Sequence, residues 1–267
     1  MSLLYLLILA LVQGVTEFLP VSSSAHLILL PRLLGTDDQG LALDVAVHVG
    51  TLVAVILFFR AEVAQALRGT ADLLRGRTGT AGARLALGLV IATIPVVIGG
   101  LVLKVTGLYL HLRSVAVIGW AMILFGVLLW LMDQRGAQEK RQEDWSLRDA
   151  WRMGLWQALA LIPGTSRSGA AITGSRALGY RREDGARIAM LMSIPTIIAS
   201  GVLLGADLAA EGDAGIWRDA AIAAAMACGA ALVALSLMMR LLRSVSYTPY
   251  VIYRFALGAV LLLIAYG

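Results

Sequence analysis

The chain has 267 residues, of which 59% are hydrophobic and 15% are charged, and its mean hydropathy is +0.83. Average soluble domains are roughly 45–50% apolar and about 25% charged, so this composition excludes an ordinary soluble protein. It indicates an integral membrane protein of a length that suits one domain. The net charge of +5 does not indicate nucleic-acid binding, because the basic residues lie in short segments between apolar runs.

The first predicted element, Leu3–Leu34, is an apolar run broken at Pro20. Around the break lies Gln13-Gly-Val-Thr-Glu-Phe-Leu-Pro-Val-Ser-Ser-Ser-Ala-His26, which places a carboxylate, three serines and a histidine between apolar stretches. Irregular backbone inside a bilayer survives only where protein buries it or a wet cavity lines it. This run therefore predicts a helix hairpin that enters the membrane and returns on the same side.

Six further runs are long and apolar enough to cross a bilayer, since a spanning helix needs about 20 apolar residues. In chain order they are Leu41–Phe59, Leu85–Leu103, Val115–Met132, Ile188–Ala206, Trp217–Met239 and Tyr250–Tyr266. Between the third and the fourth lies Trp151–Leu178, which is broken at Pro163-Gly164 and predicts a second hairpin. The sequence thus predicts an all-α membrane protein with six transmembrane helices and two re-entrant hairpins.

Positively charged residues indicate the orientation. Seventeen of the 22 Lys and Arg residues fall in the predicted loops 60–84, 133–152, 176–187 and 240–254. These segments lie on one side only if both hairpins are re-entrant, and the positive-inside rule makes that side cytoplasmic. The first hairpin then enters from outside and the second from the cytoplasm.

The two halves match under this topology. Residues 1–132, with hairpin 1–40, and residues 151–267, with hairpin 151–186, each contain a hairpin and three spans, so the copies have opposite orientations within a single membrane domain, 1–267. Gln13 and Gly35 are 22 residues apart, as are Gln157 and Gly179. In inverted repeats with discontinuous helices, the ligand site lies where the breaks meet.

Glu17 is the principal candidate of the first break, because ionisable groups at membrane depth are functional candidates by default. A hydrated, structural position at the membrane interface is the alternative. Ser22, Ser23 and Ser24 are expected at the N-terminus of the returning helix, where clustered hydroxyls and N–H groups predict an anion site, phosphate first. His26 is either a catalytic residue or a packing residue.

The second break, Pro163-Gly-Thr-Ser-Arg-Ser-Gly169, contains Arg167 within apolar sequence. A central arginine in a membrane costs roughly 2.5–3.5 kcal/mol, so it requires a partner, either Glu17 or an anionic ligand. Around Arg167, hydroxyl groups and close backbone approach are expected from Thr165, Ser166, Ser168 and Gly169. His48 is a weaker candidate and is expected to be a hydrogen-bonded core histidine.

An arginine, serines, helix ends and a carboxylate within a membrane suit a lipid that carries phosphate. Phosphoryl transfer chiefly requires positioning and neutralisation of charge. Glu17 is expected to serve as general base or as ligand to a divalent metal.

Both broken segments resemble the two signature motifs of the bacterial undecaprenyl-diphosphatase, or bacitracin-resistance, family. The likeness extends over nearly the whole chain, including Asp44–Gly50 and Ser246–Arg254. The resemblance implies hydrolysis of undecaprenyl diphosphate, recycling of the carrier lipid for peptidoglycan synthesis, and bacitracin resistance. It also implies dependence on Mg or Ca and a site that faces the periplasm from the bacterial inner membrane.

By position, the resemblance makes Glu17 the catalytic glutamate, Ser23 the key serine, His26 the motif histidine and Arg167 the phosphate-binding arginine. Ser22 and Ser166 match supporting hydroxyls. Gln13 stands where many relatives carry a first glutamate, which puts a scheme with two carboxylates in doubt. Whether serine or histidine attacks phosphorus stays open, with Ser23 preferred.

Two alternatives are weighed against this function. Acid-phosphatase-like lipid phosphatases have a histidine at the spacing where this chain has Thr173, so that class is disfavoured. A transporter or flippase for the lipid phosphate would use the same scaffold and the same charged residues. The sequence leaves the oligomeric state undetermined, with a homodimer as one option.

Overall fold

The computed structural model describes residues 2–208 and 214–267. This part of the chain is helical and contains no β-strand. Its helices are α1 (Leu3–Thr16), α2 (Ser23–Leu34), α3 (Leu41–Phe58), α4 (Arg60–Leu74), α5 (Ala81–Thr106), α6 (Tyr109–Leu112), α7 (Val115–Arg135), α8 (Leu147–Ala158), α9 (Arg167–Ala177), α10 (Arg182–Leu208), α11 (Ala214–Leu241) and α12 (Thr248–Tyr266). Short 3-10 turns, η1 and η2, lie at Gln142–Asp144 and Leu159–Leu161.

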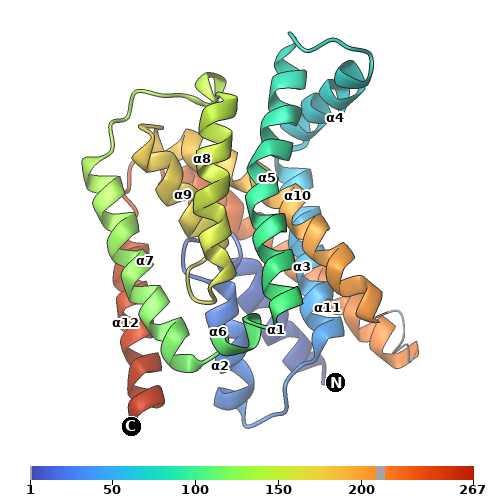
Figure 1. Cartoon of the computed structure of the whole chain (residues 1–267). Coiled ribbons are helices and arrows are strands. Elements are labelled where there is room, and N and C mark those ends of the chain that lie inside the picture. The colour runs from blue at the N-terminus through green and yellow to red at the C-terminus, as the bar shows by residue number, and fades with distance from the viewer. Residues whose placement is uncertain (1, 209–213) are drawn as a thin grey trace.

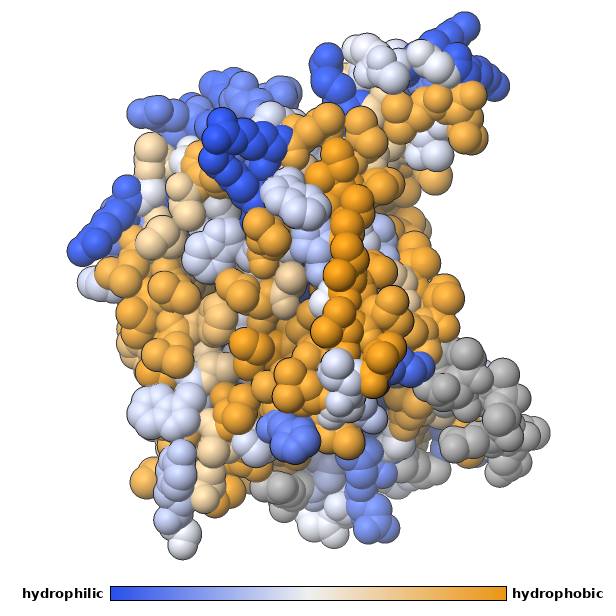
Figure 2. Space-filling model, viewed as in Figure 1, coloured by the Kyte–Doolittle hydropathy of each residue, from blue (hydrophilic) through white to orange (hydrophobic). Residues whose placement is uncertain are grey.

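Six of the described helices are long and apolar enough to cross a membrane, namely α3, α5, α7, α10, α11 and α12. They coincide with the six predicted spans, although α5 begins at Ala81 and α10 at Arg182, several residues earlier than predicted. Figure 2 shows hydrophobic side chains across the middle of one face and hydrophilic ones towards its upper and lower ends. The predicted class, an all-α integral membrane protein, is confirmed.

The two predicted breaks interrupt helices in the same way. α1 and α2 are separated by residues 17–22, and η2 and α9 by residues 162–166. In each case the residue before the returning helix is a serine with φ +71°, Ser22 in the first and Ser166 in the second. This left-handed backbone conformation is rare outside glycine, and it turns the chain back. In Figure 1, α1 and α2 occupy the lower half of the molecule and α8 and α9 the upper half.

Helix packing pairs the two halves. α1 packs against α11, and its counterpart α8 packs against α5; likewise α3 packs against α11, and α10 against α5. α7 packs against α12, which is its own counterpart. These correspondences support the two inverted units, which remain a prediction, as does the re-entrant course of both hairpins. The second unit includes residues 209–213, which lie outside the described part of the chain.

The segment 60–84, predicted as a loop, instead contains α4. Gly69 of α4 meets Gly82 at the start of α5 so closely that a Cβ on Gly69 would lie 2.0 Å from backbone atoms of Gly82. The two helices therefore pack through their backbones, and α4 covers the N-terminal turns of α5. The search for apolar runs did not indicate this helix, because charged residues such as Arg60 and Glu62 interrupt its apolar positions.

A polar cluster joins distant segments at the upper end of Figure 1, where α7 ends and α10 and α12 begin. Asp133 is buried there and accepts hydrogen bonds from Arg176 (3.1 Å), from two nitrogens of Arg182 (2.7 and 3.2 Å) and from the backbone N–H of Tyr247 (3.1 Å). Close by, the Tyr180 hydroxyl donates to Asp149 at 2.9 Å. Burial, together with this hydrogen bond, raises the pKa of the Tyr180 phenol, so it stays a donor.

Candidate active site

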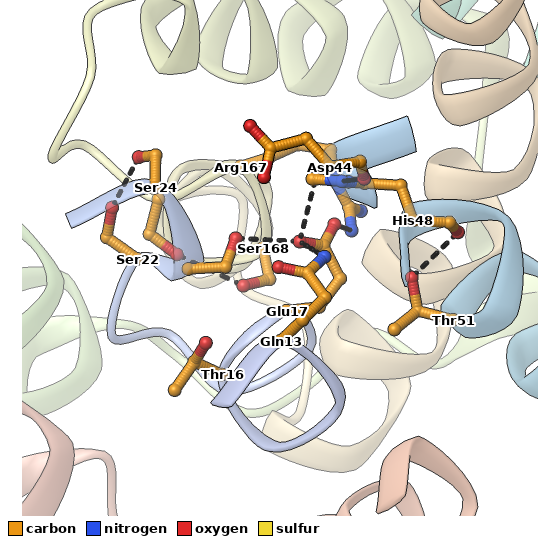
Figure 3. A network of polar contacts seen from close by, with 12 residues as sticks. Gln13, Thr16, Glu17, Ser22, Ser24, Asp44, His48, Thr51, Arg167 and Ser168 are labelled. Carbon is orange, nitrogen blue, oxygen red and sulfur yellow. Dashed lines mark hydrogen bonds and ion pairs between the residues drawn. The ribbon is translucent and has the colours of Figure 1, made fainter. Parts of the chain in front are cut away.

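The two breaks contact each other, and each contains a pair of hydrogen-bonded serines. Ser22 and Ser24 lie 3.1 Å apart through their hydroxyls, and Ser166 and Ser168 repeat that spacing in the second break. The Ser168 hydroxyl donates to the Leu19 carbonyl at 3.0 Å, which ties the second break to the first. Figure 3 shows Ser22 and Ser24 of the first break together with Ser168 of the second. The N-termini of α2 and α9, each with a positive dipole end, therefore lie in one place, as predicted.

Glu17 forms the centre of the contact between the breaks. Its Oε1 accepts a hydrogen bond from Arg167 Nη2 at 2.8 Å. Its Oε2 accepts from the Ser23 hydroxyl at 2.7 Å and from Gln13 Nε2 at 3.0 Å. The side chain is only 6% exposed. Glu17 is therefore the partner that Arg167 requires, and Ser23 is oriented by a carboxylate that can accept its proton.

Arg167 keeps one unused donor. Its Nη1 is buried and finds no hydrogen-bond partner among the described residues. The guanidinium carbon lies 6.0 Å from the centre of the Phe18 ring, which shields one side of the group. A buried N–H group without an acceptor is costly, so this nitrogen is suited to an oxygen of a bound anion.

A cavity of about 770 Å³ connects these groups. The predicted residues that line it are Glu17, Ser22, Ser23, Ser24, Ser166 and Arg167. Apolar side chains of α3 and α10, such as Val49 and Ile198, form another part of its wall. The cavity thus combines an anion-binding region with a surface suited to a hydrocarbon chain.

His48 has the hydrogen bond expected from the sequence, and it also lies beside Glu17. Its Nε2 lies 3.7 Å from Glu17 Oε2, and it lines the cavity together with Asp44 of the same helix. His48 Nδ1 is 2.6 Å from the Asp44 carbonyl oxygen, which can only accept, so Nδ1 carries a proton. The signal available in the sequence was the pair of ionisable residues four positions apart within a spanning run.

His26 lies elsewhere. Its Nδ1 donates to the Ser22 carbonyl at 2.7 Å, and its Nε2 is 2.6 Å from the Tyr253 hydroxyl. His26 is not one of the described residues that line the cavity. The geometry supports a role in holding the turn at Ser22, and the predicted catalytic role stays a prediction.

Three other predicted residues shape the second break without lining the cavity. Ser168 is bonded to Leu19, as described. Thr165 is fully buried, and its hydroxyl has no partner among the described residues. Gly169 leaves room for its neighbours, because a Cβ there would lie 3.1 Å from the Ser166 Cβ and 3.2 Å from Arg254 Nη1.

Arg254 was missed as a site residue. It is fully buried on α12, and its guanidinium donates to five backbone carbonyls. The acceptors are Pro20, Gly164 and Thr165 in the two breaks, and Ala121 and Met122 in α7. Arg254 therefore binds both interrupted segments at once and places a positive charge next to the backbone of both breaks.

Comparison with known proteins identifies the family. A family model described as "Bacitracin resistance protein BacA" matches residues 6–260. The chain belongs to this family. Among the relatives, a protein named undecaprenyl-diphosphatase from Ruegeria sp. (strain TM1040) is 68% identical over the full length of both chains. Proteins of the same name from Jannaschia sp. (strain CCS1) and Chromohalobacter salexigens are 66% and 45% identical, the latter over 98% of each chain.

The family resemblance implies Mg or Ca, and the site offers a small set of oxygen ligands. The described residues hold no cluster of three or more His, Cys, Asp or Glu side chains suited to a metal ion. Glu17 is nevertheless accompanied by Gln13, whose Oε1 is buried and has no partner within the described protein. One carboxylate and one amide oxygen are ligands of the kind that a hard cation takes, and Mg²⁺ is commonly held by few such groups together with substrate phosphates. Glu17 lines the cavity, whereas Gln13 is fully buried and is not among the described residues that line it.

Proposed function

We propose that the chain hydrolyses undecaprenyl diphosphate to undecaprenyl phosphate and inorganic phosphate, which returns the carrier lipid to cell-wall synthesis and confers bacitracin resistance. The observation that carries this proposal is the contact of Glu17 with both Arg167 and Ser23 inside a partly apolar cavity. The relatives named undecaprenyl-diphosphatase, with identities up to 68%, support the same activity.

Arg167 binds the terminal phosphate through Nη1, and the helix ends at Ser22 and Ser166 add N–H donors for its other oxygens. Charge spread over phosphate oxygens is the feature of the transition state that such donors stabilise. Phe18 on one side and the apolar wall on the other limit access of water, which strengthens these interactions.

Ser23 attacks the terminal phosphorus while Glu17 takes the proton from its hydroxyl. A bond forms between Ser23 Oγ and phosphorus, the bond from phosphorus to the bridging oxygen breaks, and the lipid monophosphate leaves with the electron pair. The protonated Glu17 gives its proton to the departing lipid monophosphate and becomes a carboxylate again. Water then attacks the phosphoserine, Glu17 takes a proton from that water, the bond from phosphorus to Ser23 Oγ breaks, and Glu17 returns the proton to Ser23 Oγ as inorganic phosphate leaves. Nucleophilic catalysis of this kind divides one difficult step into two.

A bound Mg²⁺ or Ca²⁺ would neutralise charge on the diphosphate. Glu17 and Gln13 would hold it, together with phosphate oxygens of the substrate. Both residues lie in the last turn of α1 or directly after it, so a single helix end would position the cation.

We further place the protein in the bacterial inner membrane with the cavity open to the periplasm. Two observations support this placement. The basic segments lie towards the end of the molecule opposite α6 in Figure 1, namely 60–84, 133–152, 176–187 and 240–254. The cavity is lined at the α6 end by Tyr109 of α6 and by Arg113, which follows α6. A homodimer stays a prediction, and chemical cross-linking in native membranes tests it.

Release of inorganic phosphate from a lipid diphosphate by the purified, detergent-solubilised protein tests the proposed reaction. Turnover is expected in the wild type and lost in Glu17→Gln, with the helical circular dichroism signal retained as the control for folding. Transfer of lipid phosphate across vesicles without phosphate release would instead support the flippase alternative and overturn the proposal.

A further inference from the structure

A second polar pair lies in the cavity, outside the residues given a role above. Gln157 of α8 is completely buried and lines the cavity, as does Thr196 of α10. Gln157 Nε2 donates to the Thr196 hydroxyl at 3.0 Å, and that hydroxyl donates to the Met192 carbonyl at 3.0 Å. Gln157 Oε1 has no hydrogen-bond partner within the described protein.

An unpaired amide oxygen in a cavity wall is costly and unusual, because buried polar groups are nearly always paired. The arrangement is also reversible. If the amide turns over, the Thr196 hydroxyl rotates from the Met192 carbonyl to donate to Oε1, and Nε2 then points to the position that Oε1 held. The pair can therefore present either an acceptor or a donor to a ligand, and the change to a donor gives up the one hydrogen bond from Thr196 to Met192.

The neighbours of this pair indicate which part of a ligand it meets. Ala160 and Leu161 follow Gln157 on the chain, and Ile197 and Ile198 follow Thr196, and all four line the cavity. The two polar groups are thus set within the apolar wall, whereas Glu17 belongs to the charged region. In a lipid diphosphate, the phosphate nearest to the hydrocarbon chain is the one bonded to it.

We propose that Gln157, oriented by Thr196, binds the lipid-linked phosphate of the substrate and keeps its contact with that phosphate after the terminal phosphate has been removed. The inference rests on the proposed function, because it assigns the two phosphates of one diphosphate to two subsites. Arg167 and Ser23 hold the phosphate that is attacked, and the Gln157 pair holds the leaving group.

The neutrality of this subsite has a chemical consequence. An amide binds a phosphate monoester through ordinary hydrogen bonds, which are weaker than those of a guanidinium. The lipid monophosphate is therefore held in register during the reaction and can still dissociate afterwards. Gln13, 144 positions earlier, occupies the matching place in the first half, where it touches Glu17 instead of the apolar wall.

Equilibrium binding to the purified protein tests the assignment with two probes, farnesyl phosphate and inorganic phosphate. In Gln157→Leu, the Kd of farnesyl phosphate is expected to rise about 10- to 150-fold, because the hydrogen bond that is lost is made to a charged phosphate. The Kd of inorganic phosphate is expected to stay unchanged. Gln157→Glu should weaken farnesyl phosphate further, because its carboxylate repels the phosphate.

Thr196→Val is the second variant, and it should weaken farnesyl phosphate in the same selective way. Thr93→Val is its matched control, because Thr93 also donates to the carbonyl four residues earlier in a spanning helix but lies outside the residues that line the cavity. Equal losses for both probes, or unchanged binding of farnesyl phosphate, would overturn the assignment. Absence of phosphate release by the wild type would reject the proposed function alone, since the binding measurement does not depend on turnover.

Discussion

Arg167→Lys separates two roles of the arginine, the ion pair with Glu17 and the proposed binding of phosphate. A lysine keeps one positive charge and can remain paired with Glu17 across the 2.8 Å contact, so the fold is retained. It cannot replace the unpartnered Nη1, to which the proposed reaction assigns a phosphate oxygen, because an ammonium lacks the planar fork of a guanidinium. One charge-assisted hydrogen bond contributes about 1.5–3 kcal/mol. At 1.36 kcal/mol for each factor of ten, kcat/KM is expected to fall about 10- to 150-fold.

Steady-state phosphate release in detergent measures this loss, with thermal unfolding as the control for folding. Arg167→Met provides the contrast, because it leaves the carboxylate of Glu17 buried without its cation. Removal of one partner of a buried ion pair costs about 3–5 kcal/mol, so this variant should lose stability as well as activity. An Arg167→Lys enzyme within threefold of wild-type kcat/KM would refute the role given to Nη1.

Four further predictions address the remaining groups. Ser23→Ala and Glu17→Gln should each lower kcat by at least about 10²-fold, and residual turnover close to wild type in either would remove that residue from the chemistry. Arg254→Lys should lower the melting temperature, since an ammonium has three donors for five carbonyls and each buried carbonyl left unpaired costs about 1–3 kcal/mol; an unchanged melting temperature would contradict the assigned contacts. Chelation with EDTA should abolish phosphate release and added Mg²⁺ or Ca²⁺ should restore it, whereas full activity in EDTA would exclude the cation. Gln13→Glu should lower the Mg²⁺ concentration needed for half-maximal activity, and an unchanged requirement would separate Gln13 from the metal.

The spanning helices were predictable because each is a long apolar run, and a bilayer requires such runs whatever the packing. The helix α4 was not predictable in this way, because a close backbone approach at Gly69 stabilises it and hydropathy does not register that contact. The starts of α5 and α10 also differ from the predicted ones. Each of these helices begins with a less apolar turn, which lies outside the apolar run on which the prediction depended.

The contact between Glu17 and Arg167 was predictable, because an isolated charge at membrane depth carries a free-energy cost that a partner of opposite charge reduces. Arg254 was not, because its partners are carbonyl groups, which every residue carries and no sequence pattern marks. The place of His26 could not be read from its distance along the chain. It lies nine residues from Glu17, but on α2 its ring contacts Tyr253, and it is not among the described residues that line the cavity, so its catalytic role stays a prediction.

The anchoring of Asp133 has a consequence for the route of the lipid. Its carboxylate accepts four hydrogen bonds from the segments that begin α10 and α12 and from α9, so an opening at that end would have to break these contacts. The cavity reaches instead to Tyr109 and Arg113 beside α6, at the opposite end of the molecule. With the orientation proposed above, lipid is expected to enter and leave through the leaflet on the α6 side.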